Sequence, residues 1–256
     1  MIKIMNNSIL LTLIFIVSFL KADVITIATD EWYPYGCNPK SQSQGYLMDI
    51  VREIFEPLGH KVVYKTIPWS RAIALGKHGK ITAILGALKD DAPSYIFPKT
   101  MQGMSKNSFC VRKELDWKYT SLESLEVIKL GVSKAYAYGK EIDSYINRYG
   151  MDENRIYSIP GDTPLELGFK LIKRERITAL IEDDTVLRYN IEKQGLKKKF
   201  KIAGSIGSDS LYIAFSHKLE KSQEYANILD NGLKKLRKSG RLKIILEKYN
   251  LEDWGK

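Results

Sequence analysis

The sequence predicts an α/β fold built as two lobes, and three observations lead to this prediction. From residue 24 onward, short β-branched segments alternate with segments in which apolar residues recur every three or four positions. The alternation occurs in two successive series, which indicates sheets layered by helices. No internal repeat or low-complexity linker separates the two series, so one continuous chain is expected to form both lobes.

The first series has a strand–helix–strand–helix–strand order. Its expected elements are strand 24–29, helix 45–59, strand 61–66, helix 68–77 and strand 81–85. The pattern is clearest in helix 45–59, where Leu47, Ile50, Ile54 and Leu58 lie on one stripe. Gly59 follows as a plausible C-terminal stop.

The second series continues the same alternation to the C-terminus. Its expected strands are 108–111, 127–132, 155–159, 177–181, 200–203 and 211–215. Its expected helices are 136–149, 163–173, 184–194, 225–236 and a last helical stripe over 242–249. Gly240 separates the final two helices.

The first 22 residues are typical of a secretory signal peptide. Lys3 provides a basic start, an apolar run follows over residues 9–20, and Ala22 is a small residue at a possible cleavage point. The apolar run is shorter than the roughly 20 residues that span a bilayer. An uncleaved membrane anchor is the alternative. We expect residues 1–22 to be removed and the protein to reach the periplasm without a lipid, since no Cys lies near residue 22.

The formal net charge of +10 does not predict a nucleic-acid partner. Its basic residues are scattered, the densest run being Lys197–Lys199, and the aromatic residues follow strand ends instead of interleaving with a basic face. We therefore interpret the charge as a solvated basic surface.

The cysteines and histidines indicate no metal, cofactor or catalytic centre. Cys37 and Cys110 lie far apart in the sequence, and an oxidising compartment allows a disulfide between them, which the sequence leaves open. The three histidines, His60, His78 and His217, match no nucleophilic or metal-binding pattern.

Six segments carry recognisable local patterns. They are ITIATDEWYPY (25–35), GYLMDIVREIFEPLGHKVVY (45–64), PWSRAIALGKHGKITAILGA (68–87), KLGVSKAYAYG (129–139), ITALIEDDTVLRY (177–189) and ILDNGLKKLRKSGRLKIILEKYNLEDW (228–254). The last is the most diagnostic, with a Leu-x-x-Leu-x-x-Ser-Gly turn that leads into an Ile-Leu-x-x-Tyr helix. In this order and spacing, the segments resemble the bacterial extracellular solute-binding proteins of family 3, the polar amino-acid type.

The resemblance implies a type II periplasmic-binding-protein fold, also called a Venus flytrap. One lobe would comprise residues 23–110 and 212–256, the other residues 111–211, and strands near 109–111 and 211–214 would form the hinge. A small polar ligand would bind between the lobes, beyond the strand C-termini. The implied partner is the permease of an ABC importer, with no cofactor, and we expect a monomer.

The resemblance also suggests binding residues. Asp30 and Tyr33 match an acid and an aromatic that contact the ligand, Trp69 matches an aromatic on the facing wall, and Asp183 matches the carboxylate that holds a ligand ammonium group. Core packing is the alternative for Tyr33 and Trp69. For Asp183 the alternative is a helix N-cap, although Asp184 is the expected cap.

Further candidates lie in loops around the same cleft. They are Tyr35, Arg71, Gly86, Ala87, Tyr136 and Tyr138. For Tyr35 there are two interpretations: it contacts the ligand, or it only stabilises the turn in which it lies. Gly86 and Ala87 would offer backbone groups, and the loop 133–138 precedes a helix whose N-terminus could hold an anion. Tyr136 and Tyr138 contribute there or are surface aromatics.

One departure from the family pattern concerns the ligand carboxylate. Amino-acid binders usually carry a Thr-x-x-Arg element after the strand that matches 81–85, and its Arg clamps the α-carboxylate. This chain has GALKDDAPSYIFP (86–98) there, without an Arg, which puts a standard α-amino acid ligand in doubt. Arg71 is a possible substitute or a solvated helix residue.

The leading hypothesis is therefore a periplasmic solute-binding protein for import. A sensory binding protein that reports to a receptor is one alternative. A cyclohexadienyl dehydratase-like enzyme on the same fold is another, and it would need a general acid such as Asp30 or Glu31.

Overall fold

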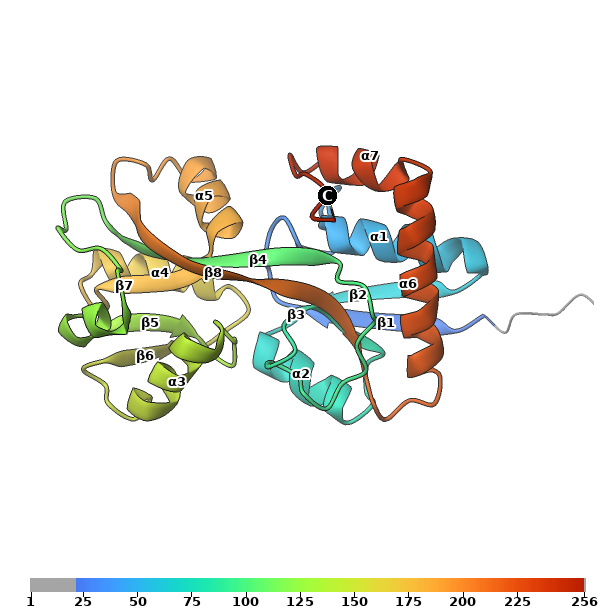
Figure 1. The fold of residues 1–256 in the computed structure, drawn as a ribbon, viewed down its shortest axis with the longest axis horizontal. Helices are drawn as coiled ribbons and strands as arrows, with labels where there is room; N and C mark the ends of the chain where they lie inside the picture. The colour runs from blue at the N-terminus through green and yellow to red at the C-terminus, as the bar shows by residue number, and fades with distance from the viewer. Residues whose placement is uncertain (1–21, 256) are drawn as a thin grey trace, which may run out of the picture.

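The computed structural model describes residues 22–255 and shows two α/β lobes joined by two long strands (Figure 1). The predicted signal peptide falls outside the described residues except for Ala22. Between residues 22 and 255, none of the helices has the length and apolar character needed to cross a membrane.

Eight strands form one sheet in the order β2-β1-β3-β8-β4-β7-β5-β6. They are β1 (Val24–Thr29), β2 (Lys61–Thr66), β3 (Ala83–Ala87), β4 (Gly103–Arg112), β5 (Leu130–Ser133), β6 (Ile156–Ile159), β7 (Ala179–Asp183) and β8 (Phe200–Phe215). Strand β1 runs parallel to β2 and β3, and β5 runs parallel to β6 and β7. The central strands β8 and β4 pair antiparallel with each other and with β3 and β7. Each lobe is thus a parallel α/β unit, and an antiparallel ribbon connects them.

The helices cover the sheet lobe by lobe. They are α1 (Tyr46–Phe55), α2 (Trp69–Lys77), α3 (Lys140–Tyr149), α4 (Pro164–Lys173), α5 (Asp184–Lys193), α6 (Ser222–Lys238) and α7 (Arg241–Glu247). Short 3₁₀ helices span Glu56–Leu58 and Leu122–Val127. In Figure 1, α1, α2, α6 and α7 surround strands β1–β3, whereas α3, α4 and α5 lie on the other lobe.

The ribbon β4–β8 crosses between the lobes. Its pairing runs from Gly103 opposite Leu211 to Arg112 opposite Phe200. The expected strands 200–203 and 211–215 are one continuous strand, because the polar stretch between them pairs with β4. The predicted lobe boundaries, after residues 110 and 211, fall inside these two strands.

Local sequence accounts for most helix limits. Leu47, Ile50 and Ile54 of α1 are buried as expected, and each such side chain stabilises the fold by about 1.5–3 kcal/mol. Leu58, expected on the same stripe, is exposed, because the α-helix ends at Phe55 and continues as a 3₁₀ turn. Helix α3 begins at Lys140 and not at residue 136. Gly139 has a φ of 90°, outside the helical region, and ends the loop that precedes the helix.

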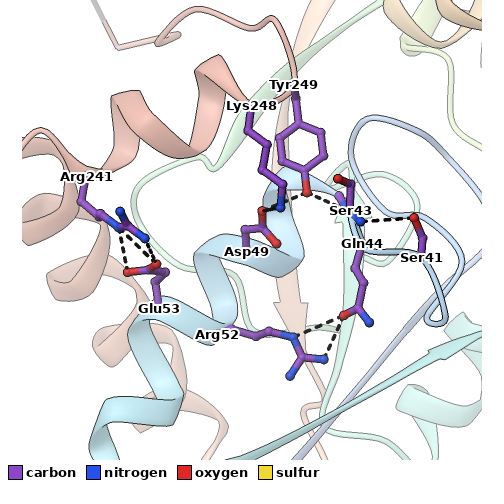
Figure 2. Close-up of polar contacts among 10 residues, drawn as sticks. Ser41, Ser43, Gln44, Asp49, Arg52, Glu53, Arg241, Lys248 and Tyr249 are labelled. Atoms are coloured by element: carbon purple, nitrogen blue, oxygen red, sulfur yellow. Dashed lines mark hydrogen bonds and ion pairs between the residues drawn. The ribbon is translucent and has the colours of Figure 1, made fainter.

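The C-terminal helix is tied to α1 by charged side chains (Figure 2). Arg241 pairs with Glu53 at 2.6 Å, and Lys248 pairs with Asp49 at 2.9 Å. Tyr249 donates a hydrogen bond to the same Asp49 carboxylate at 2.9 Å. Because these contacts link residues about 200 positions apart, they close lobe 1 around its two chain segments.

Both cysteines are free, buried thiols, so the disulfide that the sequence allows is not formed in this structure. Cys37 lies in the turn after β1, and Cys110 lies within β4 and pairs with Leu180 of β7. Burial raises the pKa of each thiol to about 12, which keeps both protonated and unreactive at neutral pH.

Candidate ligand-binding site

A cavity lies between the two lobes, where the parallel strands of each lobe end. Its walls come from β1, β3 and β7 and from the loops after β3 and β5. The lining residues are Thr29, Asp30, Trp32, Trp69, Leu85, Gly86, Leu88, Asp91, Ser105, Asn107, Tyr136, Ala137, Glu182 and Leu211. The cavity is small, about 20 Å³, which is room for about one water molecule. An organic ligand therefore requires the walls to move apart.

Asp30 forms the floor of the cavity on lobe 1. It directly follows β1 and is only 2% exposed. Its Oδ2 accepts a hydrogen bond of 2.7 Å from the Tyr136 hydroxyl of lobe 2, and its Oδ1 accepts a long one of 3.4 Å from Thr29. The Tyr136 bond therefore holds the two lobes together across the cavity.

Glu182 faces Asp30 from lobe 2. It lies near the end of β7 and is 1% exposed. Its Oε1 accepts 2.8 Å hydrogen bonds from the indole Nε1 of Trp32 and from the backbone N–H of Asp183. Because Trp32 belongs to lobe 1, this bond is a second link across the cavity.

Asp91 supplies the third link. It lies in the loop after β3, where its Oδ2 accepts from the backbone N–H of Leu88 at 2.8 Å. Its Oδ1 accepts from the backbone N–H of Ala137, in lobe 2, at 2.6 Å. Part of the Asp91 residue is exposed, unlike Asp30 and Glu182.

Three aromatic rings surround the acidic groups. Tyr136 lies edge-on to Trp32 and to Trp69, with ring centroids 6.4 Å and 6.2 Å apart. Trp69 is the first residue of α2 and is buried against the sheet. Gly86 has a φ of 86°, and a Cβ there would lie 3.1 Å from the Trp32 ring, so this position brings backbone close to the indole.

The cavity is acidic without a basic counterpart. No Lys, Arg or His is among its lining residues in the described part of the chain. Removal from water raises the pKa of Asp30 and of Asp91 to about 7 and that of Glu182 to about 8. The arrangement is therefore suited to a group that carries positive charge or donates hydrogen bonds.

Asp183 lies behind the cavity wall and not in it. Its Oδ1 caps α5 by accepting from the Val186 N–H at 3.0 Å, the role that the sequence assigned to Asp184. Its Oδ2 accepts from Tyr35 at 3.0 Å and from Ser105 at 2.8 Å. Asp184 instead forms an ion pair with Arg188.

Other predicted residues lie around the cavity without lining it. Tyr33 stacks on Tyr189 of α5 with ring centroids 3.8 Å apart, beside a separate surface hollow. Arg71 is exposed on α2, Ala87 packs in the core of lobe 1, and the Tyr138 hydroxyl accepts from the Ser133 N–H. Of the predicted residues, four line the cavity: Asp30, Trp69, Gly86 and Tyr136.

Ten of the fourteen lining residues were not predicted. Four of these ten matter most for the chemistry of the cavity: Trp32, Asp91, Asn107 and Glu182. Trp32 precedes the predicted Tyr33, and Glu182 precedes the predicted Asp183. The prediction therefore identified the correct segments but chose the residue one position too far along each. Asp91 could have been noticed as an acid in the segment that lacks the expected Arg. Nothing in the sequence distinguishes Asn107 from other polar residues of its strand.

Comparison with known proteins identifies the family. The family model described as bacterial extracellular solute-binding proteins, family 3, matches residues 25–252. This chain belongs to that family. The match covers both lobes and the resemblance seen in the sequence is confirmed. A search of curated proteins found no match.

Several solved structures share the fold. An ancestral arginine-binding protein bound to glutamine superposes with a TM-score of 0.72 and 21% identity, over 90% of this chain and 98% of that one. A histidine kinase sensor domain with similarity to periplasmic binding proteins gives 0.74 and 18%, over 91% and 98%. A structure from work on glutathione import through GshT and the cystine ABC importer of Streptococcus mutans gives 0.71 and 18%, over 91% and 98%. The type II periplasmic-binding-protein fold is therefore confirmed.

Proposed function

We propose that this family 3 protein captures a small polar solute between its lobes in the periplasm and delivers it to the permease of an ABC importer. The observation that carries the proposal is the cavity itself. Polar side chains from both lobes converge on it, and hydrogen bonds from Tyr136, Trp32 and Ala137 bridge it. A solute with its own polar groups can replace these bridging partners and hold the lobes closed.

The import step is supported by family membership and by the solved relative whose study names an ABC importer. In the closed form, surfaces of both lobes would lie side by side and could contact the permease together. The periplasmic location is supported by the family description and by the predicted signal peptide.

Solute binding is tested on purified protein that has been unfolded and refolded to strip bound molecules. Thermal unfolding and small-angle X-ray scattering are recorded against amino acids, amines, organic acids and small peptides. A solute that binds only the native state adds about 2.7 kcal/mol at 100 times its Kd. We expect at least one compound to raise the Tm by several degrees and to reduce the radius of gyration. A panel without any such compound would contradict the proposal.

A sensory role is the second candidate, because one solved relative is a histidine kinase sensor domain. Uptake of the radiolabelled solute by cells separates the two roles. Import predicts that deletion of the gene abolishes high-affinity uptake. A sensor predicts unchanged uptake and loss of a transcriptional or chemotactic response to the solute.

An enzymatic role on the same fold is tested directly. The purified protein is incubated with prephenate and with arogenate, and the products are followed by absorbance. If the protein only captures a solute, it should show no more turnover than the variant Asp30→Asn, which lacks the buried acid. Turnover that depends on Asp30 would replace binding with catalysis as the function.

A further inference from the structure

We propose that the cavity selects an organic cation without a carboxylate group, such as a primary amine or a guanidine, and rejects the corresponding amino acid. This inference rests on the proposed function and specifies its ligand. It is carried by the charge of the cavity walls, by unused hydrogen-bonding atoms that face the cavity, and by the rings around them.

The charges around the cavity all have one sign. Asp30, Asp91 and Glu182 come from three different elements, the end of β1, the loop after β3 and β7. A ligand carboxylate would enter beside these acids with no basic side chain among the lining residues to pair with it. A buried charge without a partner is strongly unfavourable, whereas an ammonium or guanidinium group would be paired here.

Two buried polar groups at the cavity have unused hydrogen-bonding capacity. Glu182 uses only Oε1, and no described residue donates to its Oε2. Asn107, on β4, is 4% exposed, lines the cavity and makes no side-chain hydrogen bond within residues 22–255. Since buried polar groups are normally hydrogen-bonded, the free Glu182 Oε2 indicates a ligand with N–H donors, to which the Asn107 carbonyl oxygen could add a second acceptor.

The ring arrangement favours an organic cation over a metal ion. Trp32, Trp69 and Tyr136 enclose the acids, and aromatic faces attract cations such as ammonium groups. In the described part of the chain, no three His, Cys, Asp or Glu side chains are close enough together to coordinate a metal ion.

The loop after β3 accounts for the loss of amino-acid recognition. In the segment 86–98, where the family resemblance leads us to expect an Arg for the ligand carboxylate, the chain places Asp91 at the cavity wall. Asp91 is fixed there by the N–H groups of Leu88 and Ala137. An acid at this place reverses the charge that an α-carboxylate needs.

The test uses pairs of compounds that differ only in the α-carboxylate. They are agmatine and arginine, cadaverine and lysine, putrescine and ornithine, and histamine and histidine. Refolded protein is titrated with each compound by calorimetry and thermal unfolding at pH 8. We expect at least one amine to bind at least tenfold more tightly than its amino acid.

The three outcomes distinguish this inference from the proposed function. Tighter binding of an amine supports both. Tighter binding of an amino acid, or binding only of organic acids, overturns the cation inference and leaves solute capture intact. Absence of binding by every amine, amino acid, organic acid and peptide overturns both.

Variants locate the charge that is responsible. Glu182→Gln keeps the acceptor for Trp32 and removes the negative charge, and we expect amine affinity to fall by about tenfold or more. Glu31→Gln removes a charge of the same kind from an exposed residue next to Asp30 in the sequence, outside the cavity, and should change the affinity less than twofold. The Tm of Glu182→Gln without amine should be unchanged or raised, which shows that the variant is folded. Equal amine affinity in Glu182→Gln and the original protein would overturn the inference.

Discussion

Raising the pH from 5 to 9 should open the two lobes when no solute is added. In the closed structure, burial raises the pKa of Asp30 to about 7 and that of Glu182 to about 8. When the lobes separate, both groups return to water, where such carboxyl groups have pKa values near 4. Closure is thus most favourable below pH 4, where both forms are protonated. It weakens progressively as the pH rises from about 4 to about 8, because only the open form then loses its protons, and it changes little at higher pH.

The size of the effect follows from the Asp30 carboxyl alone. A group with a pKa of about 7 in the closed form and about 4 in water opposes closure by about 4 kcal/mol above pH 7. Glu182 and Asp91 act in the same direction, because burial also raises the pKa of each of these carboxyl groups. The other ionisable groups that act on these three are Asp143, Asp162, Asp183 and Tyr136.

The assay is small-angle X-ray scattering at pH 5, 7 and 9, with the fluorescence of the cavity tryptophans recorded in parallel. We expect the radius of gyration to increase with pH in the original protein. In the double variant Asp30→Asn and Glu182→Gln the increase should be smaller, since of the three acids only Asp91 can still ionise. An identical response to pH in both proteins, or none in the original protein, would refute this reasoning.

Three further changes test individual contacts by urea denaturation. Trp32→Phe keeps an aromatic ring but removes the N–H donor to Glu182 Oε1, and it should lower the free energy of unfolding by about 1–3 kcal/mol; an unchanged value would mean that water replaces the indole N–H. Gly86→Ala places a Cβ 3.1 Å from the Trp32 ring at a φ of 86°, for an expected loss of about 1–2 kcal/mol or more. Phe169→Ala removes a buried ring that stacks on Phe200 with centroids 5.0 Å apart, and about 3–5 kcal/mol should be lost.

Sequence patterns predicted the regular elements well where each element is defined by its own residues. The strands 24–29 and 61–66 have the expected bounds, and the helix expected over 184–194 spans Asp184–Lys193. These segments have clear apolar periodicity and distinct ends. Strand β8 was expected as two strands, because residues 204–210 are rich in Gly and Ser and are ordered by pairing with β4, a contact with residues distant in sequence.

The cavity was predicted less completely, for a reason of geometry. Neighbouring side chains at the end of a strand point in opposite directions, so an error of one position exchanges a cavity residue for a buried one. Glu182 and Asp183 are adjacent acids, and only the structure shows that Glu182 faces the cavity while Asp183 caps α5. The same ambiguity applies to the run of aromatic residues that contains Trp32 and Tyr33.

The route of β8 through the sheet has a consequence for how the chain folds. Strand β3 pairs with β8, so Ile84 meets Ala214, 130 residues later (214 − 84). Lobe 2 is formed by the residues in between, and contacts between residues that are close in sequence form fastest. We therefore expect lobe 2 to fold while β3, with its five buried residues AILGA, still has an unpaired edge. Such an apolar edge is prone to aggregate until β8 covers it, so slow synthesis or truncation before residue 211 should favour aggregation over partial folding.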